Sequence, residues 1–214
     1  MAVVTVQSLP QGPIAANTHI VTDTATGKIA VVDAGDCTAE LLSMLSGGTV
    51  EYILLTHGHF DHILGVAKLK QQFPNAQICI HALDAACLTD EEESLCSWEC
   101  AGQQTTVQPD RLLHDGDKIT LGETELTVLH TPGHTKGGVC YADFENRNLF
   151  TGDTLFCLTA GRTDFPGGSD EDLLASLIRL KNLDGDFTVY TGHNRATTLD
   201  YERTHNRYMR RIGR

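Results

Sequence analysis

The segment THGHFDH, residues 56–62, gathers four side chains that can bind a metal ion, namely His57, His59, Asp61 and His62. His57 and His59 are two residues apart, so on an extended or loop backbone both imidazoles point to the same side. Asp61 and His62 follow where the chain is expected to turn into a helix, which lets them face the same cavity from a different angle. This spacing favours metal coordination over packing in a hydrophobic core.

Further side chains of the same kind follow short apolar segments elsewhere in the chain. LTVLH leads to His134, NLF leads to Asp153 and TVY leads to His193, just as YILL leads to His57. In sheets flanked by helices, ligand sites gather at the carboxyl ends of strands. The sequence therefore predicts that these groups, although far apart in the chain, converge on one site.

The predicted site holds too many ligands for one ion. It contains five imidazoles and two carboxylates, whereas a tetrahedral zinc takes about four protein ligands in a structural site and about three in a catalytic one. Two-metal hydrolytic sites instead hold their ions about 3.5–4 Å apart, bridged here by a carboxylate and a shared water or hydroxide. Imidazole and carboxylate ligands suit zinc, iron or manganese, and we take two zinc ions as the first expectation.

The elements that must position these side chains alternate between strands and helices. A helix is expected from Thr38, a plausible N-cap, to the glycines at 47–48, another over 62–75 until Pro74 ends it, and a third from Ser169 to residue 183. The acidic run at 90–94 is interpreted as the solvated start of a helix, where the helix dipole favours carboxylates. Segments rich in β-branched residues predict strands at 3–7, 19–23, 28–33, 52–56, 118–122, 125–130, 138–143, 148–153 and 187–193.

Composition excludes several classes of protein. The chain has 214 residues, 41% hydrophobic and 21% charged, with no linker or repeat, which predicts a globular chain with a single domain over residues 1–214. A net charge of −12 argues against nucleic acid as a partner. We expect no membrane partner and a cytoplasmic location, because the N-terminus lacks a signal-like segment and the seven cysteines are an odd number typical of a reducing compartment.

The quoted motifs resemble a known family. THGHFDH, followed by HTPGHTKGG, LFTGDTLF and YTGHN, is similar to the signature of the metallo-β-lactamase fold superfamily. The resemblance implies an α/β protein with the αββα four-layer sandwich, in which two mixed β-sheets are flanked by helices and the metals lie at one edge of the sheets. It implies that Asp153 bridges the metals, with Asp33 nearby as a supporting residue. The first metal would take His57, His59 and His134, and the second Asp61, His62 and His193.

A narrower resemblance concerns the substrate. AGRTDFPGG is similar to glyoxalase II-like hydrolases, which cleave hydroxyacylglutathione thioesters, and this implies that Arg162 lies near the glutathione moiety. The last segment, YERTHNRYMRR, is interpreted as a final helix and resembles a glyoxalase II element that makes Arg210 a candidate for a glutathione carboxylate. Arg207 and Tyr208 replace the Pro and Phe of that element. We expect no separate C-terminal helical substrate domain within residues 1–214.

The function expected from this resemblance is hydrolysis of a small-molecule thioester, with hydroxyacylglutathione first, by a bridging hydroxide. Asp61 and Asp153 would be the catalytic carboxylates. GRTDF also resembles persulfide dioxygenases, which bind one iron through the equivalents of His57, His134 and Asp153. A lactonase or other ester hydrolase and a non-catalytic metal-binding module remain alternatives, and the oligomeric state is left open.

Other metal-competent residues are assigned to ordinary structure. Cys96 and Cys100 lie one helical turn apart without a second pair, so buried apolar cysteines are favoured over a metal or redox site. The remaining histidines are expected to be packing or surface residues; they are His19, His81, His114, His130 and His205.

Overall fold

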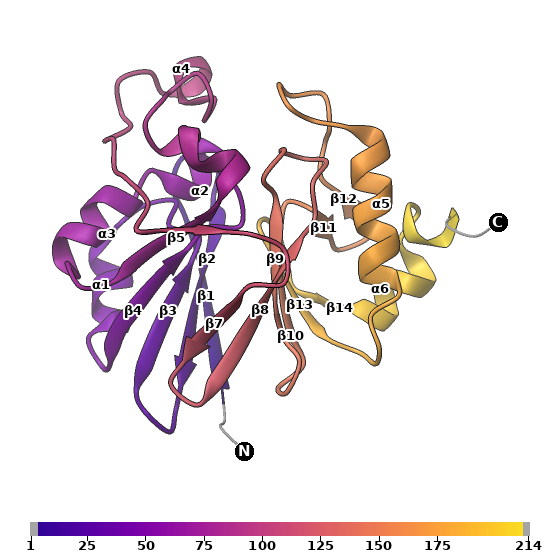
Figure 1. Cartoon of the computed structure of the whole chain (residues 1–214), viewed down its shortest axis with the longest axis horizontal. Helices are drawn as coiled ribbons and strands as arrows, with labels where there is room; N and C mark the ends of the chain where they lie inside the picture. Colours follow the sequence, from indigo (N-terminus) through magenta and orange to yellow (C-terminus); the bar gives the residue numbers. More distant parts are fainter. Residues whose placement is uncertain (1–3, 212–214) are drawn as a thin grey trace.

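The computed structural model describes residues 4–211 and contains two six-stranded sheets that face each other (Figure 1). The first sheet has the order β1-β2-β3-β4-β5-β6. β1 and β2 and then β2 and β3 pair antiparallel, whereas β3 to β6 run parallel. Its strands are β1 Val4–Gln11, β2 Ala16–Asp23, β3 Lys28–Val32, β4 Thr49–Leu54, β5 Gln77–His81 and β6 Arg111–Leu113.

The second sheet has the order β14-β13-β10-β9-β8-β7 and is also mixed, because β10 and β13 run parallel while its other pairs are antiparallel. A small hairpin, β11 with β12, stands beside it. The strands are β7 Lys118–Leu121, β8 Thr124–His130, β9 Val139–Asp143, β10 Asn148–Gly152, β11 Leu155–Phe156, β12 Thr159–Ala160, β13 Thr188–Thr191 and β14 Thr197–Thr198.

Helices cover the outer face of each sheet, which completes four layers (Figure 1). The helices over the first sheet are α1 Ala39–Leu45 and α3 Val66–Gln72, and those over the second are α5 Asp170–Lys181 and α6 Leu199–His205. Alternation along β3 shows how one strand serves two layers: Ile29 and Val31 pack outward with α1 and α3, whereas Ala30 and Val32 pack inward between the sheets. The predicted αββα sandwich is confirmed.

The predicted helix starts at Thr38 and Ser169 are confirmed. The Thr38 hydroxyl accepts a hydrogen bond from the backbone N–H of Leu41 at 3.2 Å, and the Ser169 hydroxyl accepts one from Asp172 at 3.2 Å. Each cap satisfies a backbone donor that the first helical turn leaves unpaired. Both caps therefore set where their helices begin.

The single helix predicted over residues 62–75 is wrong. The chain instead forms a short helix, α2 Phe60–Ile63, and then α3, with Gly65 between them. The backbone N–H of Gly65 donates to the carbonyl of Ala34 at 2.8 Å, and a Cβ at this position would overlap with the backbone of Asp36. Contact with the loop after β3 therefore interrupts the helical pattern.

The helix start predicted at the acidic run is also wrong. Residues 91–95 form a turn, and the next helix, α4 Cys96–Glu99, begins only after Leu95. The carboxylate of Glu91 accepts hydrogen bonds from the backbone of Gly102 and Gln104, and that of Asp90 accepts one from Glu92. These side chains close a loop rather than face a helix dipole.

The predicted final helix is shorter than expected. It ends at His205, and a separate 3₁₀ turn, η2 Met209–Arg211, follows. The side-chain amide of Asn206 donates to the carbonyl of Thr159 at 2.9 Å and to the carboxylate of Glu202 at 2.9 Å, which ties the end of α6 to the hairpin of β11 and β12. Asn206 has an extended ψ of 126° and ends the helix there.

Several strands differ from the sequence analysis. β1 continues past Pro10 to Gln11, whereas the prediction over residues 3–7 stops earlier and begins at Val3, outside the described residues. Proline is tolerated because β1 is an edge strand, where one side of the backbone needs no partner. Five strands were not predicted, namely β5, β6, β11, β12 and β14, and of these β5 and β6 extend the parallel part of the first sheet. Among residues 4–211, no helix has the length and apolar character needed to cross a membrane.

Candidate metal centre

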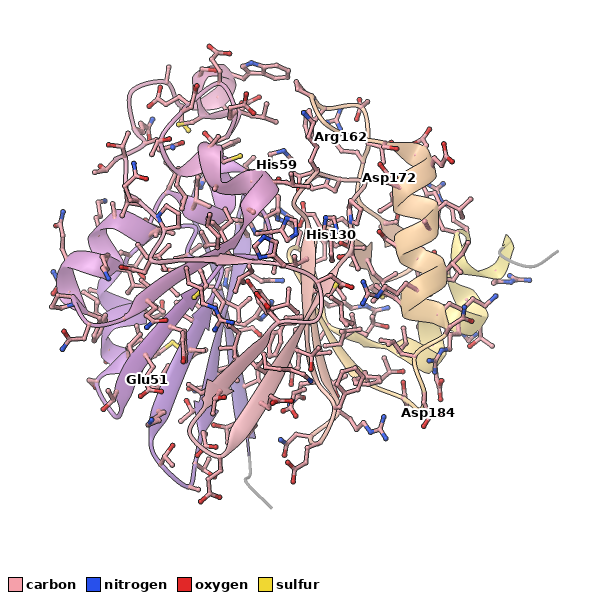
Figure 2. All side chains as sticks on the ribbon, in the orientation of Figure 1. Glu51, His59, His130, Arg162, Asp172 and Asp184 are labelled. Carbon is pink, nitrogen blue, oxygen red and sulfur yellow. The ribbon has the colours of Figure 1, made fainter. Side chains whose placement is uncertain are left out.

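The predicted ligand groups meet at one end of the two sheets. His57 to His62 follow the end of β4, His134 follows β8, Asp153 follows β10 and His193 follows β13. Figure 2 shows His59 and Arg162 at the upper end of the molecule, whereas Glu51 and Asp184 lie toward the lower end. Because all these groups leave carboxyl ends of strands, the sheets carry them to the same edge.

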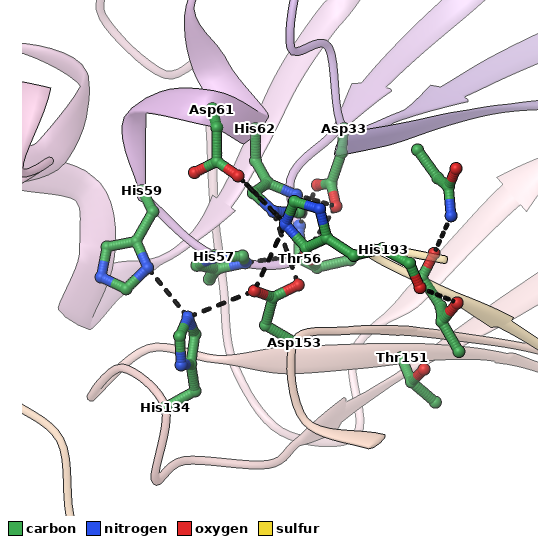
Figure 3. A network of polar contacts seen from close by, with 12 residues as sticks. Asp33, Thr56, His57, His59, Asp61, His62, His134, Thr151, Asp153 and His193 are labelled. Atoms are coloured by element: carbon green, nitrogen blue, oxygen red, sulfur yellow. Dashed lines mark hydrogen bonds and ion pairs between the residues drawn. The ribbon is translucent and has the colours of Figure 1, made fainter. Parts of the chain in front are cut away.

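The first group consists of His57, His59 and His134, whose ligand atoms lie within 4.8 Å of one another. His59 Nδ1 lies 2.9 Å from His134 Nε2 (Figure 3). His57 Nε2 is buried and has no hydrogen-bond partner in the described part of the chain. A buried imidazole nitrogen without a partner is costly unless it binds something, and a cation between these three nitrogens would satisfy it.

The second group consists of Asp61, His62 and His193, again with ligand atoms within 4.8 Å. Asp61 Oδ2 lies 3.1 Å from His193 Nε2 and 3.3 Å from His62 Nε2, and the two imidazole nitrogens lie 3.3 Å apart. Asp61 and His62 stand on α2 and His193 follows β13, so this group joins the two halves of the chain (Figure 3).

Asp153 lies between the two groups. Its carboxylate is 3.5 Å from His134 Nε2, 3.5 Å from His62 Nε2 and 3.6 Å from His193 Nε2. Asp153 Oδ1 is buried and, within residues 4–211, has no hydrogen-bond partner. One carboxylate that faces both groups, with an oxygen left free, has the position of a bridging ligand.

Hydrogen bonds behind the imidazoles fix which nitrogen faces the centre. His134 Nδ1 donates to the backbone carbonyl of Arg162 at 2.7 Å, and His62 Nδ1 donates to Asp33 Oδ2 at 2.9 Å. In both residues Nε2 is therefore left with its lone pair directed at the centre. Asp33 also accepts from the amide and hydroxyl of Thr56 at 2.8 and 2.7 Å, so its oxygens are occupied, and it orients His62 rather than serving as a ligand.

The electrostatics suit a cation. Burial, together with the neighbouring imidazoles, lowers the pKa of His57 well below its usual value and that of His59 to about 3, so both are neutral, as ligands must be. Burial alone would raise the pKa of Asp61, but His62 and His193 hold it well below its usual range. Carboxylates around His62 outweigh its burial and raise its pKa. The neutral imidazoles of His57 and His59 and the negative surroundings of His62 both suit a bound cation.

Asp84 is a supporting residue that the sequence analysis missed. It is 3% exposed, and its carboxylate accepts hydrogen bonds from Gly58 N at 3.0 Å, Thr135 Oγ1 at 2.7 Å and Gly137 N at 2.6 Å. It therefore ties the loop of His57 and His59 to the loop of His134. The surrounding sequence, HALDAAC, carries no signal of this role, since its partners are mainly backbone groups of distant residues.

A cavity of about 500 Å³ opens directly onto the centre. Its floor includes ligand-type residues of both groups, and its walls come from the loop before β2, from α4 and from the segment after β12. The lining residues from the centre are His59, Asp61, His134, Asp153 and His193. A small molecule in this cavity would therefore contact both groups at once.

The structure places the two predicted substrate-binding arginines differently. Arg162 lines the cavity, and its guanidinium forms a two-bond ion pair with Asp164 at 2.6 Å for each bond. Arg210 is exposed on η2, where its backbone N–H donates to Asn206, and it is not one of the residues that line the cavity. Their roles toward a substrate stay proposals.

Residues assigned to ordinary structure lie outside the centre. Cys96 and Cys100 are buried side by side, with sulfur atoms 3.1 Å apart, and no disulfide is formed among the described residues. His19 is buried between β1 and β13, where it bonds Ser8 and the carbonyl of Thr191. His81 and His130 stack on each other with ring centroids 4.2 Å apart.

The residues present fit a pair of divalent cations. The fit rests on the buried atoms that lack partners, His57 Nε2 and Asp153 Oδ1, on the neutral imidazole of His57 and on the ionised carboxylate of Asp61. The donors are nitrogen and oxygen only, because the free cysteines lie elsewhere in residues 4–211. The fold and this centre together define an αββα protein with a two-part candidate metal-binding site.

Comparison with known proteins places the chain in a family. Residues 12–193 match the model of the metallo-beta-lactamase superfamily, so the chain belongs to this superfamily and is a metallo-hydrolase of it. A protein of Aquifex aeolicus (strain VF5) is 37% identical over 95% of its own length and 94% of this chain. The hydroxyacylglutathione hydrolase GloC of Haemophilus influenzae is 30% identical over 86% of its length and 84% of this chain.

Solved structures with the same fold include two of similar length. BLEG-1, a B3 metallo-beta-lactamase, superposes with a TM-score of 0.90 at 32% identity and covers 96% of this chain and 99% of its own. TTHA1623, solved in a di-iron-bound form, gives a TM-score of 0.84 at 33% identity and covers 94% of this chain and 99% of its own. The predicted family and fold are confirmed.

Proposed function

We propose that this protein is a binuclear metallohydrolase that cleaves thioesters, with hydroxyacylglutathione as the first candidate substrate. The observation that carries the proposal is the pair of three-residue ligand groups that share Asp153 on the floor of a cavity of about 500 Å³. In this proposal His57, His59 and His134 hold one cation and Asp61, His62 and His193 hold the other, both zinc in the first instance.

The chemistry divides between the cations and the chain. Bound divalent ions would supply Lewis acidity and lower the pKa of a water molecule. Asp153 holds the two halves of the site at a fixed separation, and Asp33 and the Arg162 carbonyl keep the imidazoles oriented. Asp61 lines the cavity 3.1 Å from His193 Nε2, and in this proposal its ionised carboxylate accepts a hydrogen bond from the attacking water and orients it.

The preference for a thioester rests on relatives and on one residue. Two relatives of about 30% identity or more carry the name hydroxyacylglutathione hydrolase. Arg162 lines the cavity, and we propose that it meets a glutathione carboxylate by exchanging its partner Asp164. Arg210, on η2, is a second proposed contact. Arg162→Ala and Arg210→Ala should each raise the KM for glutathione thioesters. Neither should change the KM for thioesters of N-acetylcysteamine.

One experiment tests the proposal as a whole. The purified protein is assayed with S-lactoylglutathione, an acyl-lactone, a simple ester and glutathione persulfide, and its metal content is measured by mass spectrometry on the same sample. We expect two metals per chain and thioester hydrolysis faster than cleavage of lactone or ester. His130→Ala, a change in a histidine outside both ligand groups, is the control and should retain activity.

Two results would overturn the proposal in different ways. A preference for the lactone would assign the same site to a lactonase. One iron per chain with oxygen uptake on glutathione persulfide would assign it to a persulfide dioxygenase. The ligand residues are shared by both alternatives, so the relatives named hydroxyacylglutathione hydrolase support the hydrolase, and metal count with oxygen uptake separates the two.

A further inference from the structure

One end of the cavity has an apolar wall beside His59 and His134. The ring of Phe165 lies with its centroid 5.5 Å from that of His59 and 6.2 Å from that of His134. Trp98 meets Phe165 edge to face at 6.3 Å, which continues the aromatic surface toward the mouth. We call this surface the aromatic wall; it consists of Phe60, Leu95, Trp98 and Phe165, all of which line the cavity.

The aromatic wall is built by a separate piece of the core. Phe60 and Leu95 pack with Cys96 and Cys100 in a small hydrophobic cluster of their own, against which Phe165 rests. This cluster supports α4, which carries Trp98 with 56% of its surface exposed. Large apolar side chains that stay exposed next to a reactive centre are typical of a binding surface.

Charge at this end argues against an anionic acyl group, because Arg162 is paired with Asp164 or, in the proposed function, with a glutathione carboxylate. Of the described residues that line the cavity, Arg162 is the only arginine or lysine, and both its Nε and Nη2 already bond Asp164. Its guanidinium also lies 4.1 Å above the ring of Phe165, so it packs as part of the wall. Glu99 lines the cavity as well and would repel a carboxylate.

We propose that the aromatic wall binds the acyl group of the substrate, and that this acyl group is apolar and uncharged, branched aliphatic or aromatic. The proposal rests on the proposed thioester hydrolysis for its catalytic part and changes its acyl group: an apolar acyl group should be preferred to the hydroxyacyl group that the relatives' names suggest. The cavity, at about 500 Å³, has room for such a group beside the centre. Each methylene buried against the wall should raise kcat/KM about fourfold.

Binding can be tested without turnover, because Trp98 is the only tryptophan in the chain. Its fluorescence is followed in metal-free protein during titration with uncharged thioether analogues of N-acetylcysteamine thioesters, which cannot be hydrolysed. A 4-methylpentyl thioether should give a saturable change at a concentration at least about tenfold lower than a 2-hydroxypropyl thioether. Equal affinities, or no saturable change, would overturn the proposal.

A pair of variants assigns the effect to the wall. Phe165→Leu, which keeps an apolar side chain, should weaken binding of the 4-methylpentyl thioether severalfold, and Phe165→Ala should weaken it more. Leu174→Ala is the matched control, since Leu174 is 47% exposed on α5 and does not line the cavity. Equal losses in Phe165→Ala and Leu174→Ala would contradict a role for the wall.

A kinetic series separates this inference from the proposed function. N-acetylcysteamine thioesters of lactate, acetate and 4-methylpentanoate share one thiol and differ only in the acyl group. We expect the 4-methylpentanoyl thioester to have a kcat/KM at least about tenfold above the lactoyl thioester. Hydrolysis with lactoyl preferred would refute the acyl inference alone. No hydrolysis of any thioester, with the fluorescence result as expected, would refute the proposed function alone.

Discussion

At the scale of single residues, Asp153 is the side chain that lies between the two ligand groups and is proposed to bridge their metals. Its carboxylate faces His62, His134 and His193 at 3.5 to 3.6 Å. Asp153→Ala should therefore lower the occupancy of both metal sites, whereas His193→Ala should mainly empty the second. Metal per chain is measured by mass spectrometry after dialysis against a fixed free-metal concentration. Two metals per chain in Asp153→Ala would reject the bridge.

Asp84 gives a second residue-scale prediction, on stability and the site together. Asp84→Ala leaves the buried donors of Gly58, Thr135 and Gly137 without their acceptor. We expect the free energy of unfolding to fall by about 3 kcal/mol, because unpaired buried donors cost about 1–3 kcal/mol each and water recovers part of the loss. Urea unfolding measures it. Asp184→Ala, in an exposed aspartate, is the control and should change stability by less than about 0.5 kcal/mol.

The contrast between Asp84 and the ligand groups shows what the sequence could predict at this scale. His57, His59 and Asp61 lie close in the chain, and their residue types limit the chemistry to metal binding. Asp84 is a single carboxylate whose partners are 26 and more residues away, two of them backbone amides. Backbone amides exist at nearly every position, so no residue type marks them in advance.

At the scale of elements, the approach of the loop after β8 to α5 depends on Gly133. This residue has a φ of 134°, its carbonyl accepts from Ser169 at 2.8 Å, and a Cβ would overlap with the backbone of Leu173. Gly133→Ala should cost about 2–4 kcal/mol of stability and lower metal affinity by displacing His134. Gly116→Ala, with a φ of 81° but open space around it, should cost about 1 kcal/mol. Equal losses of stability in Gly133→Ala and Gly116→Ala would show that the close approach of Leu173 does not matter.

His19 connects β2 of the first sheet to β13 of the second and gives a pH prediction. Burial is the main cause that lowers its pKa from 6.5 to about 4. Between about pH 6.5 and about pH 4, His19 therefore binds a proton more readily in the unfolded chain than in the folded one. The free energy of unfolding falls as the pH is lowered through this range. When the pH is lowered from about 7.5 to about 5, the free energy of unfolding of the wild type should fall by about 2 kcal/mol more than that of His19→Gln. Urea unfolding of metal-free protein measures this, and parallel pH profiles would contradict it.

Elements were predicted well where local signals decide them and poorly where distant contacts do. Thr38 and Ser169 cap their own helices, so the chain nearby contains all the information needed. The break at Gly65 depends on Ala34 and Asp36, and the end of α6 depends on Asn206 bonding to Thr159. Helical periodicity carries no trace of such partners, which is why the predicted helices there were too long.

At the scale of the whole molecule, the centre joins the two halves of the sandwich. One ligand segment, residues 57–62, follows the first sheet, and the other ligands follow strands of the second. The contacts between Asp61 and His193 and between His62 and Asp153 cross from one half to the other. Cations bound there would link the halves in the folded state only, so metal binding should stabilise the fold.

This coupling predicts how the whole protein responds to metal removal. A chelator should lower the free energy of unfolding, and with it the urea midpoint. The loss should be about 3 kcal/mol for each site whose free metal concentration was about 100 times its dissociation constant. Restored zinc should return the midpoint to its first value. His193→Ala should keep about half of the chelator-sensitive stability, whereas His130→Ala, outside both groups, should keep all of it. A midpoint that does not change on chelation, in protein shown by mass spectrometry to hold two metals, would mean that the cations do not link the two halves.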